Sequence, residues 1–186
     1  FGDDTVDGGE TVTTGTDHDT IDASGLTGPV TVTHTGTEEG LITHGSDSVQ
    51  WTGVESVLLG GGDDSVDGNS DPRGLEYDGR GGDDTLIGGS GGDSLTGGDG
   101  DDSLDGGSGD VTLNVGSGDT ALGGDGDDIF NVSAGDVNGG NLTVTGGENN
   151  ETLGDTLNIS GPATVTMTGA EAGTVDWLDG STLTFS

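Results

Sequence analysis

The sequence has no cysteine and only two basic residues, and both absences narrow what the chain can be. Without cysteine there can be no disulfide and no zinc site built from thiolates. With 36 acidic residues, the formal net charge is −34 at pH 7, which repels the phosphates of nucleic acid. No apolar run approaches the roughly 18 residues that a membrane-spanning helix needs. We therefore expect no nucleic-acid partner and no membrane insertion, and we expect cations as partners.

Hydrophobic side chains are also scarce, at 26% of the residues, and aromatic ones make up 3%. Low hydrophobicity combined with high net charge is typical of disordered chains. A folded state of this chain therefore requires that something neutralises its carboxylates.

Aspartates recur at a nearly constant interval in the middle of the chain. Six of them are separated by steps of 9, 9, 8, 9 and 9 residues: Asp84, Asp93, Asp102, Asp110, Asp119 and Asp128. Glycines precede each one, and Leu86, Leu95 and Leu104 lie two residues after the first three. Each unit is predicted to be a glycine-rich turn followed by a short strand with one inward apolar residue, because frequent glycine excludes a helix. Such units bury a core only when they stack, as in a solenoid.

Stacking would bring carboxylates of neighbouring turns close together. At about 4 Å two like charges repel by roughly 4 kcal/mol at an effective dielectric near 20, and a domain has only about 5–15 kcal/mol of stability. Calcium reverses this, because it takes 6–8 oxygen ligands from carboxylates and backbone carbonyls. Aspartate and the open glycine turns supply both kinds of oxygen. The sequence therefore predicts Ca²⁺ between stacked turns, and no EF-hand loop is present as an alternative.

Two consecutive segments, GGSGGDSLT at 88–96 and GGDGDDSLD at 97–105, resemble the nonapeptide repeat of the repeats-in-toxin (RTX) calcium-binding proteins of secreted bacterial type. Looser matches lie at 1–7, 16–22, 60–68 and 123–131. The resemblance implies a parallel β-roll with Ca²⁺ held between successive turns. It implies as metal ligands the sixth-position aspartates, which are Asp4, Asp19, Asp64, Asp84, Asp93, Asp102 and Asp128. Asp110 and Asp119 are left out of this set, because an eight-residue step precedes Asp110 and their aliphatic residues come three positions later.

A second, longer repeat joins residues 28–52 to residues 161–186. Pro29 aligns with Pro162, and after a one-residue slip Trp51 aligns with Phe185. Both copies alternate apolar and polar residues, which predicts strands. We expect these strands to form wider coils or a small sheet continuous with the roll. His18, His34 and His44 are expected to be surface or half-buried residues and not a metal site.

We predict an all-β protein, a right-handed parallel β-solenoid (β-roll) with calcium-binding turns, as one elongated unit over 1–186. It divides into a strand module at 19–59, calcium-binding repeats at 60–132, and an incomplete second strand module at 133–186. The predicted function is a calcium-stabilised structural segment of a secreted or cell-surface bacterial protein, extracellular and not an enzyme.

Two other functions stay open: an adhesin or ligand-binding module, which a flat threonine array would favour, and a non-catalytic part of a secreted enzyme. The phase of the two module copies also predicts a longer repetitive chain or head-to-tail association into filaments.

Overall fold

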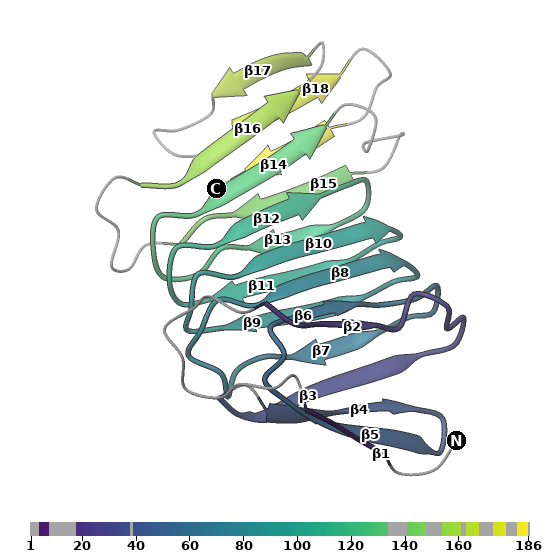
Figure 1. Cartoon of the computed structure of the whole chain (residues 1–186). Helices are drawn as coiled ribbons and strands as arrows, with labels where there is room; N and C mark the ends of the chain where they lie inside the picture. The colour runs from purple at the N-terminus through teal and green to yellow at the C-terminus, as the bar shows by residue number, and fades with distance from the viewer. Residues whose placement is uncertain are drawn as a thin grey trace.

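The computed structural model describes residues 4–7, 18–37, 39–133, 141–147, 154–160, 163–167, 173–177 and 182–185. Within these residues every regular element is a β-strand, and the strands form two sheets. The same residues contain no helix that is long and apolar enough to span a membrane. The predicted all-β solenoid is thus confirmed, and Figure 1 shows its strands stacked along one axis.

Sheet B has seven strands, and every pairing within it is parallel. In spatial order they are β16 (Thr156–Ser160), β14 (Ile129–Ser133), β12 (Thr112–Val115), β10 (Ser94–Asp99), β8 (Glu76–Gly81), β6 (Ser56–Leu58) and β2 (Thr20–Asp22).

Sheet A has twelve strands, and its central part is also parallel. In spatial order they are β1 (Asp4–Asp7), β5 (Asp47–Thr52), β4 (Glu39–His44), β3 (Val30–Gly36), β7 (Ser65–Asp67), β9 (Thr85–Gly89), β11 (Ser103–Gly107), β13 (Thr120–Leu122), β15 (Asn141–Thr145), β19 (Thr182–Phe185), β18 (Gly173–Trp177) and β17 (Ala163–Met167). Between β6 and β16 successive strands alternate between the sheets, so that one coil consists of two strands and two turns (Figure 1).

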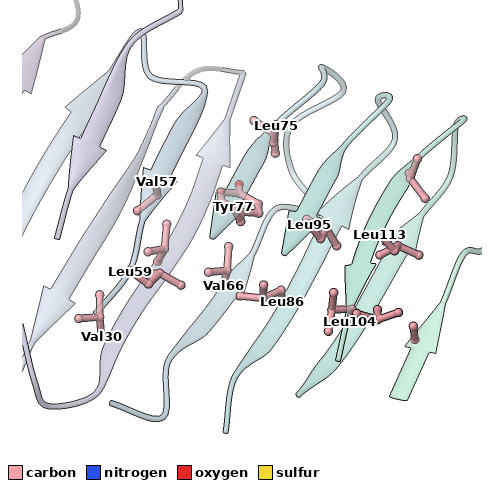
Figure 2. Close-up of a cluster of buried hydrophobic side chains, with 14 of the residues drawn as sticks. Val30, Val57, Leu59, Val66, Leu75, Tyr77, Leu86, Leu95, Leu104 and Leu113 are labelled. Carbon is pink, nitrogen blue, oxygen red and sulfur yellow. The ribbon is translucent and has the colours of Figure 1, made fainter. Parts of the chain in front are cut away.

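The centre of the core contains two apolar ladders, one on the inner face of each sheet. The sheet B ladder is Ile21, Val57, Tyr77, Leu95, Leu113, Phe130 and Leu157. The sheet A ladder is Val32, Val66, Leu86, Leu104, Ala121 and Val144. Figure 2 shows part of both ladders, with Tyr77, Leu95 and Leu113 from sheet B and Val66, Leu86 and Leu104 from sheet A. Full burial of a side chain such as Leu95 contributes about 1.5–3 kcal/mol.

The nine-residue unit is therefore half a coil. Leu95 lies in the other sheet from Leu86 and Leu104, and Leu86 stacks directly on Leu104. Residues that stack on one another are accordingly two nonapeptides apart, and not one.

The two copies of the longer repeat fold into three-stranded meanders with the same pairing. Val30 lies opposite His44 in the first copy, and Ala163 lies opposite Trp177 in the second. The one-residue slip in the sequence is present as well, because Gly40 faces Trp51 where Gly173 faces Phe185. Both meanders are continuous with sheet A, through β3 on β7 and β19 on β15. The module boundaries at 19–59, 60–132 and 133–186 stay predictions.

Candidate calcium sites

Each turn brings one residue, two positions before an inward-facing ladder residue, against the equivalent residue of the next coil. We call the two resulting rows columns A and B, because they precede the strands of sheets A and B. Column A is Val30, Asp64, Asp84, Asp102, Asp119 and Leu142. Column B is Asp19, Glu55, Leu75, Asp93, Val111, Asp128 and Asp155.

One oxygen of each column A carboxylate bonds to the preceding coil. Oδ1 accepts the backbone N–H of the column residue before it, at 2.7 Å from Val30 to Asp64 and from Asp64 to Asp84. The same bond is 2.8 Å from Asp84 to Asp102 and 3.0 Å from Asp102 to Asp119. These carboxylates are nearly inaccessible to solvent. Each therefore serves as a buried connection between two coils.

Column B repeats this arrangement where it carries an aspartate. Leu75 donates its N–H to Asp93 Oδ1 at 2.8 Å, and Val111 donates to Asp128 Oδ1 at 3.0 Å. Asp128 in turn donates to Asp155 Oδ1 at 2.9 Å.

The other carboxylate oxygen, Oδ2, accepts no hydrogen bond from a described residue at two column A positions. Oδ2 of Asp84 and Oδ2 of Asp102 are buried, and within the described part of the chain neither accepts a hydrogen bond. A buried carboxylate oxygen without a donor is unfavourable by about 1–3 kcal/mol or more. A bound cation removes this penalty.

Glycine keeps open the space beside this second oxygen. A Cβ added to Gly79 would lie 2.2 Å from Asp84 Oδ2 and 2.5 Å from the carbonyl oxygen of Gly97, one coil further on. A Cβ on Gly88 would likewise lie 2.5 Å from both Asp93 Oδ2 and the Gly106 carbonyl oxygen. Carboxylate and carbonyl oxygens from two coils thus converge at these glycines.

This donor set fits calcium, which prefers flexible coordination by oxygen. The described residues contain no group of three or more His, Cys, Asp or Glu side chains that could hold a metal. The residues that would hold Ca²⁺ here are single aspartates such as Asp84 and Asp93, together with backbone carbonyls of the neighbouring coil such as those of Gly97 and Gly106. The bound ion would supply the positive charge that the columns lack.

Burial disfavours the charged form of the column carboxylates. Burial, as the largest cause, together with the charges of neighbouring aspartates raises the pKa of Asp84 to about 7 and that of Asp119 to about 6. Burial is also the main cause of the raised pKa of Asp64, Asp93 and Asp102. Backbone N–H donors lower the pKa of each, but less than burial raises it. Burial in the columns thus favours carboxylates that are either protonated or bound to a metal ion.

The structure brings most of the predicted ligands into the columns. Asp64, Asp84 and Asp102 lie in column A, and Asp19, Asp93 and Asp128 lie in column B. Asp4 begins β1, but its side chain lies outside the described residues. That these seven residues bind calcium stays a prediction.

The phase break lies at a different place than the sequence indicated. The column residue after Asp102 on the chain is Val111, nine residues on, and not Asp110. Asp119 is fully buried in column A, and the short step lies between Val111 and Asp119. The sequence feature that indicates the correct phase is the pair Leu113 and Ala121, because each inward-facing residue follows its column residue by two positions.

Asp110 belongs to an outer row of exposed aspartates. It accepts the N–H of Asp127 at 3.0 Å, as Asp63 accepts that of Asp83 and Asp83 accepts that of Asp101. These bonds also join consecutive coils, but they lie in contact with water.

Asp93→Ala is expected to weaken calcium binding more than Asp110→Ala. The first change removes a buried carboxylate and leaves the N–H groups of Leu75 and Gly89 without an acceptor, at about 1–3 kcal/mol each. The second exposes one N–H to water and should stay within about 0.5 kcal/mol. Calcium titrations followed by circular dichroism measure both. Equal loss of affinity in the two variants would contradict this assignment.

Acidification is expected to substitute partly for calcium. The pKa of Asp84 is about 7 in the folded chain, against about 3.9 for an unperturbed aspartate. A raised folded-state pKa gives stability that is present at low pH and is lost as the pH rises towards 7. The calcium-free chain should therefore gain β signal between pH 8 and pH 5, in metal-free buffer with light scattering to exclude aggregates. No gain over this range would be inconsistent with buried carboxylates.

Residues 78–113 match the family model of the RTX calcium-binding nonapeptide repeat, in four copies. No curated protein matches the chain. The matched residues contain Asp84, Asp93 and Asp102, together with the glycine turns around them. This part of the chain is therefore a segment of RTX calcium-binding repeats with a β-roll fold, as its two nonapeptides predicted. Ca²⁺ is the cofactor of these repeats.

One group of polar residues, at the N-terminal end of the stack, was not predicted from the sequence. Glu55 occupies a column B position and contacts Arg73, which in turn contacts Asp71. Asp71, His34 and Tyr77 are buried and contact one another in series. His34 is only 3% exposed, so the expectation of a surface or half-buried histidine was wrong for this residue. Asp71 lies in a turn that does not match the nonapeptide pattern, and nothing in its local sequence distinguishes it from a solvated aspartate.

Proposed function

We propose that the chain is a calcium-stabilised structural segment of a secreted or cell-surface bacterial protein, in which it acts as a scaffold or stalk. The observation that carries this proposal is the pair of carboxylate columns that join consecutive coils. RTX repeats are structural and occur in secreted bacterial proteins, and calcium modules of extracellular proteins work at about 10⁻⁴–10⁻³ M Ca²⁺. An extracellular location follows from the same reasoning.

Small-angle X-ray scattering tests this role. A disordered chain of this length has a radius of gyration of about 46 Å, whereas a compact one has roughly 16 Å. We expect a value near the disordered limit in chelator. In calcium we expect a much smaller value with a rod-like profile. A profile that calcium leaves unchanged would contradict the proposal.

We also propose that such segments continue end to end. β3 pairs in parallel with β7, with Val32 opposite Val66. β17 corresponds to β3, and among the described strands it pairs only with β18. The sequence GDDTVDG at 2–8, which contains β1, matches GDDSVDG at 62–68, which contains β7. A strand like β1, from a second copy or from a longer chain, therefore suits the open edge of β17.

Light scattering and electron microscopy with and without Ca²⁺ test the version with a second copy. Calcium should promote filaments, because it neutralises carboxylates across each junction. A monodisperse monomer at high protein concentration in Ca²⁺ would leave only the longer-chain version.

A groove on the outer face of sheet B favours a second candidate function, ligand binding. The groove has a volume of about 820 Å³, and its polar lining includes Asp78, Arg80, Asn114, Asn131 and Asn158. The asparagines form a ladder in which Asn131 donates to Asn114 at 3.0 Å and Asn158 donates to Asn131 at 2.9 Å. Regular amide donors and acceptors of this kind suit a hydroxyl-rich ligand such as a glycan. Titration of the calcium-loaded chain with oligosaccharides, with Asn131→Ala as the control, tests this candidate.

The outer face of the parallel part of sheet A does not form a flat threonine array. It carries one row of outward-facing hydroxyl residues, which includes Ser65, Thr85, Ser103 and Thr120. The other outward-facing row is mixed and holds Asp67, Ile87, Asp105 and Leu122.

A further inference from the structure

One turn of column B differs from the glycine–aspartate turns around it because it carries an arginine. Residues 68–75, GNSDPRGL, connect β7 to β8, and their column residue is Leu75, which has no carboxylate. The turn instead carries Arg73, one of only two basic residues in a chain of net charge −34.

Glu55, in the coil before this turn, acts as a column carboxylate. It is 8% exposed, and its Oε2 accepts the N–H of Asp19 at 3.0 Å, as Oδ1 does in the aspartates. Its second oxygen differs from those of Asp84 and Asp102, which accept no hydrogen bond from any residue that the structure describes. Oε1 of Glu55 accepts a hydrogen bond from Arg73 Nη2 at 3.1 Å. A guanidinium nitrogen thus supplies the positive partner that the second oxygens of Asp84 and Asp102 lack among the described residues.

Asp71 holds Arg73 in this position from the other side. Its Oδ1 accepts the backbone N–H of Arg73 at 3.0 Å and lies 3.8 Å from Nε of the same residue. Asp71 is fully buried, and its Oδ2 lies 3.4 Å from Nδ1 of His34. His34 Nε2 contacts the hydroxyl of Tyr77 in the core ladder. The turn is therefore anchored in the core, and the guanidinium is positioned between the two carboxylates.

We propose that Arg73 takes the place of a calcium ion between the Glu55 coil and the next coil of column B, so that this junction closes without metal. Arginine suits this position, because its planar donors can bind two carboxylates at once and its charge is permanent. This one junction of column B then needs no metal, whereas the other carboxylate junctions depend on calcium. The inference rests on the proposed calcium-stabilised role.

The test uses the whole chain and the variant Arg73→Gln, with Arg80→Gln as the matched control. Arg80 is the other basic residue, and it forms an exposed ion pair with Asp78 at 3.7 Å. The measurement is the calcium concentration at the midpoint of folding. Arg73→Gln should raise this midpoint by about tenfold, because Glu55 and Asp71 lose their counter-charge. The Arg73 side chain is 37% exposed, and we therefore expect a smaller shift of the midpoint than a fully buried ion pair would give. Arg80→Gln should shift the midpoint by about twofold at most.

The double variant Glu55→Gln/Arg73→Gln separates charge neutralisation from loss of packing. It should return the midpoint most of the way to that of the wild type, even if Arg73→Gln alone does not fold. Equal midpoints for Arg73→Gln and Arg80→Gln would overturn the inference, as would a double variant no better than Arg73→Gln. A wild-type chain that keeps its β signal without calcium would instead overturn the proposed function, and the thermal midpoints of the same variants would still test the role of Arg73.

Discussion

Removal of calcium is expected to unfold the solenoid, with loss of the β signal in excess chelator and its return at about millimolar Ca²⁺. Column A places four buried aspartates, Asp64, Asp84, Asp102 and Asp119, on consecutive coils. Neighbouring charges of one sign repel by roughly 4 kcal/mol at about 4 Å and an effective dielectric near 20. A few such pairs exceed the stability of about 5–15 kcal/mol that a typical domain has. The binding energy of calcium is therefore folding energy.

Magnesium is the control for this result. It requires tight octahedral geometry and loses its water reluctantly, so at equal concentration it should restore little of the β signal. Circular dichroism in chelator, Ca²⁺ and Mg²⁺ measures the effect. The same β content in chelator as in Ca²⁺ would show that the chain folds on its apolar ladders alone.

The fold was predictable from the sequence because its repeat is short and its apolar residues keep one phase. Leu86, Leu95 and Leu104 each follow an aspartate by two residues, which is enough to predict a strand with one inward side chain. The sequence did not show that these strands alternate between two sheets, since a nine-residue period is compatible with either half a coil or a whole one. Pairing across 18 residues, such as Leu86 with Leu104, is a property of the stack.

The column positions were predictable where aspartate and leucine were both in phase, as at Asp84, Asp93 and Asp102, and the phase was misread where only one of them was. Calcium binding at these positions stays a prediction. Following the aspartates led to Asp110, whereas following the inward residues Leu113 and Ala121 leads to Val111 and Asp119. The inward residue is the better guide, because burial fixes which face of a strand points to the core. The Arg73–Glu55 pair could not be predicted, because the two residues are 18 positions apart in segments that match no repeat.

Gly97→Ala is expected to lower both calcium affinity and stability sharply, whereas Gly61→Ala should change little. Gly97 lies in β10 and Gly61 lies in the bend between β6 and β7. Neither glycine has a positive φ, so alanine is allowed by the backbone at both. A Cβ at Gly97 would lie 2.4 Å from Asp102 Oδ2 and 3.0 Å from its Cγ. At Gly61 nothing lies within 4 Å of the added atom.

The methyl group at position 97 must displace the Asp102 carboxylate, which then loses its bond from the N–H of Asp84 as well as its place beside the ion. Overpacking and the unsatisfied buried groups together should cost about 3 kcal/mol. For a chain of this size that corresponds to a fall in melting temperature of roughly 10 °C in saturating calcium. Gly61→Ala should stay within about 0.5 kcal/mol of the wild type. Thermal melts and calcium titrations measure the stability and the calcium affinity of the two variants. Equal effects would mean that the space beside Asp102 Oδ2 has no role in binding.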